Sequence, residues 1–306
     1  PVLLEHAVFD FNRVDAVMTT DSQANMIKLM LPFLATDDLK SLTLSVSQKS
    51  AGLIPALLSV VLGNRLTSSS SATDARRSKV ERLTLHVNAE CSSDDVLIPI
   101  LTALKFCTAV SFTSFTFAAD GMLSPEAVTE LMHVLATPAF SSGVEVLNLS
   151  GVDIQTQGSH REHDMEVEKV CGIAHSFIGS GSVFPKLKEL DISRSNIFGG
   201  HKFVSAWARH PGSTGCTLEA LNVAGVELGE IGMHTLCKAL KNDEGEFAQG
   251  FGKKLQKLDL SGCSLSSVNA GNLADAIAAN HQGESGGGFE LNVSSCGIDD
   301  EAFEAL

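Results

Sequence analysis

The chain has 306 residues, a formal net charge of −14 and no tyrosine. Hydrophobic residues make up 44% of it and charged residues 19%, a balance that supports a large core and excludes intrinsic disorder. With 22 lysines and arginines against 36 aspartates and glutamates, the chain lacks the basic character that non-specific nucleic-acid binding requires. No apolar run approaches the roughly 20 residues that span a bilayer.

A short hydrophobic pattern recurs along the whole chain, in the form Leu-x-x-Leu-x-Leu. Weak copies near the N-terminus are centred on Ala7, Leu42, Leu83 and Val110. Clear copies follow, centred on Leu147, Leu190, Leu221, Leu258 and Leu291. Their spacing varies between about 27 and 43 residues, which is the range of repeat architectures.

Each copy predicts a short strand with one buried face, because apolar residues alternate with polar ones. Segments with helical apolar spacing come after the strands, for example at 127–135 and 231–240. Ser124, which precedes Pro125, and Ser266 are candidate N-cap residues for two of these helices. The chain should therefore alternate strand and helix throughout.

This pattern resembles the leucine-rich repeat family, and a full helix in each repeat resembles its ribonuclease-inhibitor-like subclass. The resemblance implies an α/β solenoid of about nine irregular repeats, forming a single domain over residues 1–306. Neither end of the sequence reads as a capping repeat, so we expect a segment of a longer array. Paired strands lie about 4.8 Å apart and packed helices about 8–10 Å apart, so the stack should curve into a horseshoe. Its parallel sheet would be concave, with the helices on the convex side.

The residue that turns the chain out of each strand departs from the family in several repeats. The family prefers Asn or Cys there, and only Asn12, Asn88, Cys263 and Cys296 comply. The other turning positions are Ser47, Phe115, Val152, Ser195 and Val226. We expect these turns to satisfy their buried backbone groups in another way. Insertions that lengthen the repeats are predicted near 66–79, 155–169, 242–254 and 280–288.

No motif in the chain argues for catalysis, a cofactor or a metal site. His160, His163 and Asp164 form the densest group of potential metal ligands, but they lie in a polar segment that reads as a solvated insertion. Gly179-Ser-Gly181 lacks the further glycine and lysine of a phosphate-binding loop. Cys263 and Cys296 read as stacked core thiols, and His86 has no visible partner that would orient it.

The candidate binding surface is the exposed face of the predicted sheet, where alternate strand residues point to solvent. Its middle position reads Val8, Thr43, Thr84 and Ser111, and then an Asn/Asp ladder: Asn148, Asp191, Asn222, Asp259 and Asn292. Glu189, Lys257 and Glu290 lie beside this ladder. Amides between carboxylates should donate to them, with Asn222 separating Asp191 from Asp259.

Two functions from different classes stay open. The first is a non-catalytic, intracellular and cytoplasmic protein-interaction scaffold, because the seven cysteines are scattered and odd in number. The second is a GTPase-activating or enzyme-inhibiting solenoid resembling the Ran GTPase activator or ribonuclease inhibitor, which stimulated GTP hydrolysis in a panel of small GTPases would reveal. Tyr, Trp and Arg, the usual binding anchors, are missing from the middle row of this face. Two roles therefore stay open for the stretch: a binding surface that uses loops and helices, or a spacer within a longer array. Negative charge increases toward the C-terminus, which favours a basic protein partner.

Overall fold

The computed structural model describes residues 5–11, 20–34, 39–62, 79–107, 110–154, 172, 184–198, 203–205, 208, 217–241, 252–281, 288–298 and 300–305. These residues fall into two compact units, Pro1–Val144 and Glu145–Leu306, and each is described by itself. The four predicted insertions lie almost entirely outside the described residues. So do Asn12, the histidine pair at 160 and 163, and the glycine pair at 179 and 181.

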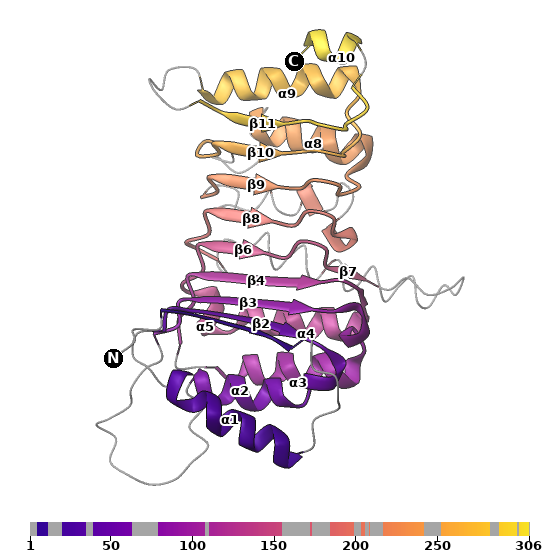
Figure 1. Ribbon diagram of the computed structural model, residues 1–306. Coiled ribbons are helices and arrows are strands. Elements are labelled where there is room, and N and C mark those ends of the chain that lie inside the picture. The colour runs from indigo at the N-terminus through magenta and orange to yellow at the C-terminus, as the bar shows by residue number, and fades with distance from the viewer. Residues whose placement is uncertain are drawn as a thin grey trace. The chain divides into compact units, whose positions relative to one another are not determined.

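The first unit contains four parallel strands in the order of the sequence (Figure 1). They are β1 (His6–Asp10), β2 (Ser41–Val46), β3 (Arg82–Val87) and β4 (Ser114–Ala119), and Met122–Leu123 forms the short β5. Its helices are α1 (Thr20–Leu34), α2 (Leu53–Val61), α3 (Asp94–Lys105), α4 (Pro125–Ala136) and α5 (Pro138–Ser141), with the 3-10 turns η2 (Gln48–Ser50) and η3 (Ala89–Cys91). The predicted alternation of strand and helix is confirmed in this unit.

The fourth strand lies five residues later than the sequence pattern placed it. The prediction centred on Val110 is wrong: Phe115 pairs with Leu83, and Phe117 pairs with Leu85. Phe115 is therefore a core residue rather than a turning residue. Thr116, which is half-buried, takes the strand position expected for Ser111. Phenylalanines stand where the other repeats have leucine, and the Phe115 ring contacts Phe140 at 4.8 Å between centroids. The strand was not recognised in the sequence because phenylalanines, rather than leucines, occupy its buried positions.

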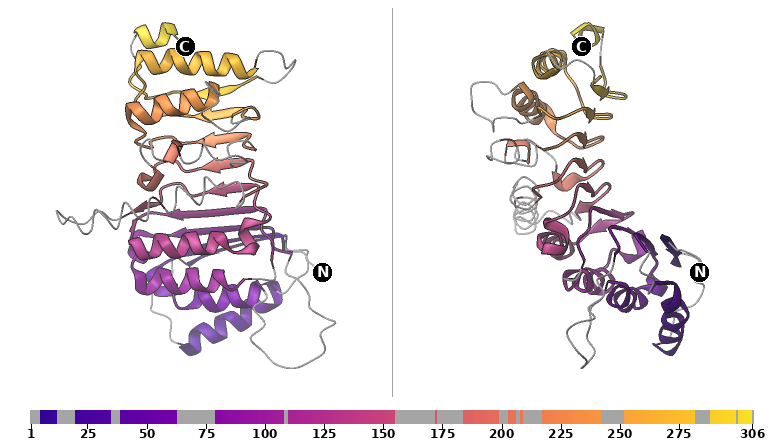
Figure 2. Two further views of the ribbon diagram at one scale, coloured as in Figure 1. Left: turned by 180° about the vertical axis from the view of Figure 1, so that it is seen from behind. Right: turned by 90° about the vertical axis from the view of Figure 1, so that its left-hand side faces the viewer.

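The second unit contains five parallel strands, again in the order of the sequence (Figure 1). They are β6 (Val146–Asn148), β8 (Glu189–Asp191), β9 (Ala220–Asn222), β10 (Lys257–Asp259) and β11 (Glu290–Asn292), and Asp153–Ile154 forms the short β7. The other elements are η4 (Asn196–Phe198), α8 (Gly229–Lys241), α9 (Ser267–His281) and α10 (Asp300–Ala305). Figure 2 shows these helices on one side of the strands and the other side of the sheet uncovered.

One leucine at the same position of each strand belongs to the core of the second unit, as the repeat pattern predicted. Leu147, Leu190, Leu221 and Leu258 are exposed by at most 2% of their surface. Each is aligned with its neighbour in the register, and Leu291 continues the row while remaining partly exposed. In-register stacking brings equivalent residues of successive repeats side by side, about 4.8 Å apart. The number of repeats and the horseshoe shape stay predictions.

The turns after the strands satisfy their backbone with either thiols or hydroxyls. The Cys263 thiol donates to the Val223 carbonyl at 3.3 Å, and the Cys296 thiol donates to the Leu260 carbonyl at 3.0 Å. Ser195 occupies the equivalent position, where its hydroxyl donates to the Leu149 carbonyl at 2.8 Å. The same hydroxyl accepts a hydrogen bond from the backbone N–H of Val152 at 3.1 Å. Serine thus replaces the family's Asn or Cys at this turn, as expected.

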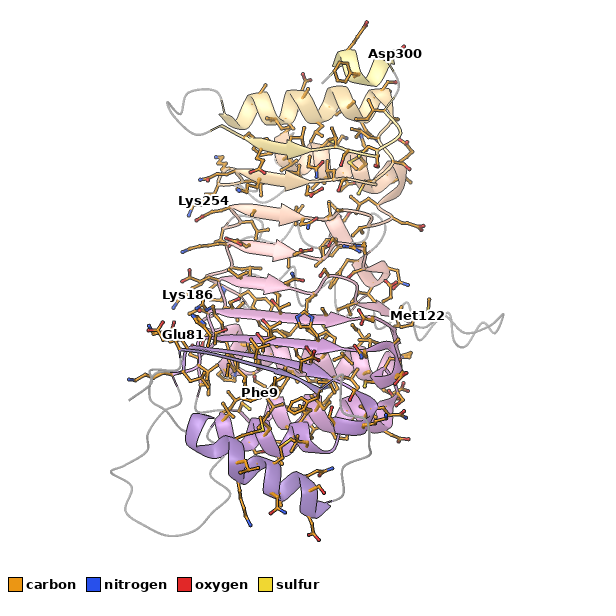
Figure 3. All side chains as sticks on the ribbon, viewed as in Figure 1. Phe9, Glu81, Met122, Lys186, Lys254 and Asp300 are labelled. Atoms are coloured by element: carbon orange, nitrogen blue, oxygen red, sulfur yellow. The ribbon has the colours of Figure 1, made fainter. Side chains whose placement is uncertain are left out.

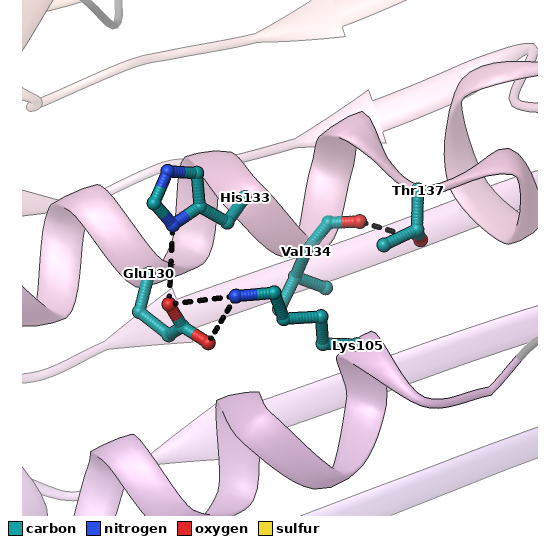
Figure 4. Close-up of polar contacts among 5 residues, drawn as sticks. All are labelled: Lys105, Glu130, His133, Val134 and Thr137. Carbon is teal, nitrogen blue, oxygen red and sulfur yellow. Dashed lines mark hydrogen bonds and ion pairs between the residues drawn. The ribbon is translucent and has the colours of Figure 1, made fainter.

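A small charged cluster joins helices α3 and α4 in the first unit (Figure 4). The Lys105 ammonium donates to both carboxylate oxygens of Glu130, at 3.1 and 3.3 Å, and His133 Nδ1 lies 3.2 Å from one of them. Burial alone would raise the pKa of the Glu130 carboxyl, but its hydrogen bonds with His133 and Lys105 and their charges lower it below its usual value. The cluster therefore holds Glu130 ionised between the two helices.

Among the described helices, none is both long and apolar enough to cross a membrane.

Candidate functional site

A hollow of about 330 Å³ lies on the uncovered face of the sheet in the second unit. We call it the strand groove. Figure 3 shows the side chains that project from these strands. The groove is lined by Val146, Leu147, Asn148, Glu189, Leu190, Asp191, Ala220, Leu221, Asn222, Lys257, Leu258, Asp259, Glu290 and Asn292. All eight residues that the sequence proposed as a binding face are among them.

The strands place these residues together because every strand presents the same two positions. The residue before the core leucine and the residue after it both point away from the helices, since side chains alternate along a strand. The parallel register aligns Asp191 with Asn222 and Asn222 with Asp259. The residues after the core leucine form the Asx ladder: Asn148, Asp191, Asn222, Asp259 and Asn292.

Every side chain of the Asx ladder accepts a hydrogen bond that ends its own strand. In each, Oδ1 accepts from the backbone N–H two residues later. The donors and distances are Ser150 at 2.9 Å, Ser193 at 2.9 Å, Ala224 at 3.0 Å, Ser261 at 2.8 Å and Ser294 at 3.1 Å. Asn and Asp share this short side chain with an acceptor oxygen, so both suit the turn. The ladder therefore shapes the backbone as well as the surface.

The second polar atom of each ladder side chain, Nδ2 of asparagine or Oδ2 of aspartate, takes no part in the turn. Asn148 Nδ2 donates to Asp191 Oδ2 at 3.5 Å, and Asn292 Nδ2 donates to Asp259 Oδ2 at 3.0 Å. Asn222 lies between the two carboxylates, but its amide nitrogen makes no hydrogen bond with any described residue. The donation expected of Asn222, the amide between two carboxylates, is therefore not found among the described residues, whereas the asparagines at the two ends of the ladder each donate to the one carboxylate beside them.

The groove is acidic. Four carboxylates line it, from Glu189, Asp191, Asp259 and Glu290, against the single ammonium of Lys257. That ammonium is paired with Glu290 Oε2 at 2.9 Å. The hydrogen bond with Glu290, then the charge of Glu290 and that of Glu189, raise the pKa of Lys257. The Lys257 ammonium is therefore held beside Glu290 on β11.

Asp259 is held in its charged form by its neighbours. Burial alone would raise the pKa of its carboxyl, but hydrogen bonds from the hydroxyl and backbone N–H of Ser261 and from the Asn292 amide lower it below its usual value. The carboxylate is therefore fully ionised at neutral pH. A pre-formed, hydrogen-bonded anion of this kind favours a positively charged ligand.

The candidate nucleophiles are separate from the groove and unsuited to attack. Cys263 and Cys296 are exposed by only 3% and 4% of their surface. Burial, with a smaller contribution from Cys296, raises the pKa of the Cys263 thiol to about 11, and burial raises that of Cys296 as well. Both thiols are protonated at neutral pH and donate to carbonyls. His86 lies exposed on β3 in the first unit. In the described parts of the chain, no three His, Cys, Asp or Glu residues are grouped as a metal site would need.

Among the exposed strand positions of the groove, Val146 and Ala220 were not proposed from the sequence. Ala220 occupies the position before the core leucine, where the neighbouring strands β8 and β10 carry Glu189 and Lys257. A short side chain there opens space over β9. Aligning the repeats and comparing the size of this side chain from strand to strand would have singled it out.

The repeat pattern also matches known family models. Residues 254–276 match the model described as Leucine Rich Repeat, and residues 290–306 match a second model described as Leucine Rich repeat. These segments contain β10 with the first part of α9, and β11 with α10. The chain contains leucine-rich repeats. Together with parallel strands and helices stacked in sequence order, the matches fit an α/β leucine-rich-repeat solenoid.

Leucine-rich-repeat domains are commonly non-catalytic scaffolds that bind other proteins, and this suggests a protein partner here. A comparison with curated proteins finds no match to the chain.

Proposed function

We propose that this chain is a non-catalytic protein-interaction scaffold of the ribonuclease-inhibitor-like subclass, and that its strand groove binds a basic segment of a partner protein. The observation that carries the proposal is the grouping of four carboxylates around one hollow whose single ammonium is already paired. Opposite charges across an interface steer association and select the correct partner.

The character of the lining favours electrostatic recognition. It contains leucine, valine, alanine, asparagine and charged residues, with no aromatic side chain and no arginine among them. Such a surface lacks the Tyr, Trp and Arg anchors that dominate many interfaces. A partner would therefore supply the anchors, and a positively charged one fits these carboxylates.

We also place the scaffold inside the cell, in the cytoplasm. Cys91, Cys107, Cys237, Cys263 and Cys296 are all free and buried. Buried thiols without disulfide partners are usual in reducing compartments. This part of the proposal rests on the thiols alone.

The test is selection of binders from a random peptide library on the immobilised protein, followed by fluorescence anisotropy with the enriched peptides. We expect enrichment of arginine and lysine, and affinities that fall as salt rises from low to high concentration. The double variant Asp191→Asn and Asp259→Asn should bind about tenfold more weakly, because two charges are lost. Asparagine keeps the turn, since Asn148, Asn222 and Asn292 already serve in it.

The matched control removes two carboxylates elsewhere in the same unit. Glu227 and Glu304 are exposed and lie outside the groove lining, so the variant Glu227→Gln and Glu304→Gln has the same net charge as the test variant. It should bind the enriched peptides almost as tightly as the wild type. Equal weakening in both variants, or selection without enrichment of basic residues, would contradict the proposal.

A further inference from the structure

The central strand of the strand groove, β9, carries the smallest exposed side chain of the three strands β8, β9 and β10. β9 presents Ala220 and Asn222, and Ala224 follows two residues later on the same path. On one side β8 presents Glu189 and Asp191, and on the other side β10 presents Lys257 and Asp259. At Ala220, β9 therefore forms a floor between two walls, β8 and β10, which carry the longer side chains of Glu189 and Lys257 there. At the next exposed position, Asn222 is as long as its neighbours Asp191 and Asp259. The backbones of the walls are two strand spacings apart, about 10 Å.

The two walls differ in charge, and together they place more carboxylates than ammonium groups beside the floor. The β8 wall carries two carboxylates. The β10 wall carries the ionised Asp259 and the ammonium of Lys257, which bonds Glu290 on β11, the strand beyond β10. The only ammonium in the lining is therefore paired with a carboxylate on the strand beyond β10. Glu189 is aligned with Ala220, and Asp191 and Asp259 flank Asn222 two residues along, so three carboxylates border this part of the groove.

The floor also offers a hydrogen-bond donor. The Asn222 oxygen is occupied by the Ala224 N–H at 3.0 Å, which orients the side chain. Its amide nitrogen has no hydrogen-bond partner among the described residues, whereas Asn148 and Asn292 donate to the neighbouring carboxylates. A polar group left without a partner is costly once a ligand excludes water, so a ligand seated here needs an acceptor atom at this place.

We propose that the space over Ala220 is a subsite for one arginine side chain of the basic segment, an inference that rests on the proposed function. The guanidinium lies between the β8 carboxylates and Asp259, its methylene chain contacts the Ala220 methyl, and the Asn222 amide donates to a carbonyl oxygen of the same segment. Arginine fits better than lysine because its planar guanidinium has five N–H donors in a fixed geometry. These donors can bind carboxylates on β8 and on β10 at the same time.

The test uses end-blocked Gly-Arg-Gly and its uncharged analogue Gly-citrulline-Gly, followed by ¹H–¹⁵N NMR of the labelled protein. Gly-Arg-Gly should shift the side-chain amide signals of Asn222 and the backbone signal of Ala220. Citrulline has nearly the same shape without the charge, so Gly-citrulline-Gly should shift neither at the same concentration. Lysine in place of arginine should bind several-fold more weakly.

Two substitutions separate the subsite from the rest of the groove. Ala220→Leu fills the space without changing charge and should weaken binding of the best basic peptide by about tenfold, with Ala220→Val intermediate. Ala224→Leu is the matched control, on the same strand path but outside the groove lining, and should change affinity less than about twofold. The NMR spectrum of each variant reports whether it is folded.

The outcomes distinguish the two proposals. If basic peptides bind the wild type and Ala220→Leu equally well, the subsite is wrong while the acidic groove stands. The subsite is equally overturned if Gly-Arg-Gly shifts signals elsewhere and leaves Asn222 and Ala220 unchanged. If no basic peptide binds the wild type at all, the proposed function itself fails.

Discussion

At the scale of single residues, each member of the Asx ladder has two tasks. One oxygen accepts the N–H that ends the strand, and the other polar atom faces the groove, as Asp259 shows with Ser261 and Asn292. Asn and Asp perform the first task equally well because both carry that oxygen. The choice between them therefore changes the charge of the groove at little cost to the fold, so binding specificity can vary while the backbone stays the same.

Lys257 gives a residue-scale prediction, because it is the cation already present in the groove. Lys257→Gln removes a positive charge that repels a basic ligand and frees Glu290 from its ion pair. We expect affinity for a basic peptide to rise by about threefold to tenfold at low salt, measured by fluorescence anisotropy. Lys241→Gln is the control: this lysine lies at the end of α8 and pairs with Asp275 at 3.6 Å. An unchanged or lower affinity for Lys257→Gln would show that the groove does not bind basic ligands through these carboxylates.

At the scale of elements, the helices of the first unit begin in two different ways. Ser124 precedes α4, and its hydroxyl accepts the Ala127 N–H at 3.0 Å while contacting the Asp94 carboxylate. Ser93 precedes α3 with the same extended backbone, but its side chain makes no capping hydrogen bond. The two serines look alike in sequence, and only the first satisfies an otherwise unpaired helix donor.

This difference leads to an element-scale prediction. Ser124→Ala should lower the free energy of unfolding by about 1 kcal/mol or more, because one N–H at the start of α4 loses its acceptor and the Asp94 carboxylate loses its hydroxyl donor. Ser93→Ala should lower it much less, since no side-chain hydrogen bond is lost. Urea denaturation followed by circular dichroism measures both. Similar losses in the two variants would contradict the assigned role of the Ser124 hydroxyl.

At the scale of the whole molecule, stability comes from stacking equivalent side chains of successive repeats. Leu258 is 1% exposed and is flanked in register by Leu221 and Leu291. Leu291 has the same position in its repeat but is partly exposed. In a repeat array each unit contacts mainly its neighbours, so the cost of a substitution depends on how many neighbours cover it.

The whole-molecule prediction compares these two leucines. Leu258→Asp should cost several kcal/mol, because an ionised carboxylate would be buried without a partner, and the second unit should unfold. Leu291→Asp should cost clearly less, since solvent still reaches that position. Circular dichroism of the wild type should show mixed helix and strand, and thermal melts of both variants give the comparison. A fully folded Leu258→Asp protein would refute the stacked core.

The repeat fold was largely predictable, and the exceptions have physical causes. Core positions such as Leu190 and Leu221 must be apolar in every repeat, so they leave a periodic signal that a reader of the sequence can find. The β4 strand escaped because Phe115 and Phe117 satisfy the same requirement with a different side chain. Burial requires a hydrophobic side chain at these positions, but it does not require a particular one.

The candidate site was predictable as a row of residues but not as a binding environment. The sequence alone determined which side chains share the exposed face, because alternation along a strand and the repeat spacing decide that. Only the tertiary structure decided that Lys257 turns toward Glu290, that the Asn222 amide has no described partner, and that Ala220 lies on the floor between two walls. Those features depend on which side chains of separate repeats meet across strands, and distances between residues more than 30 positions apart are set by packing rather than by local sequence.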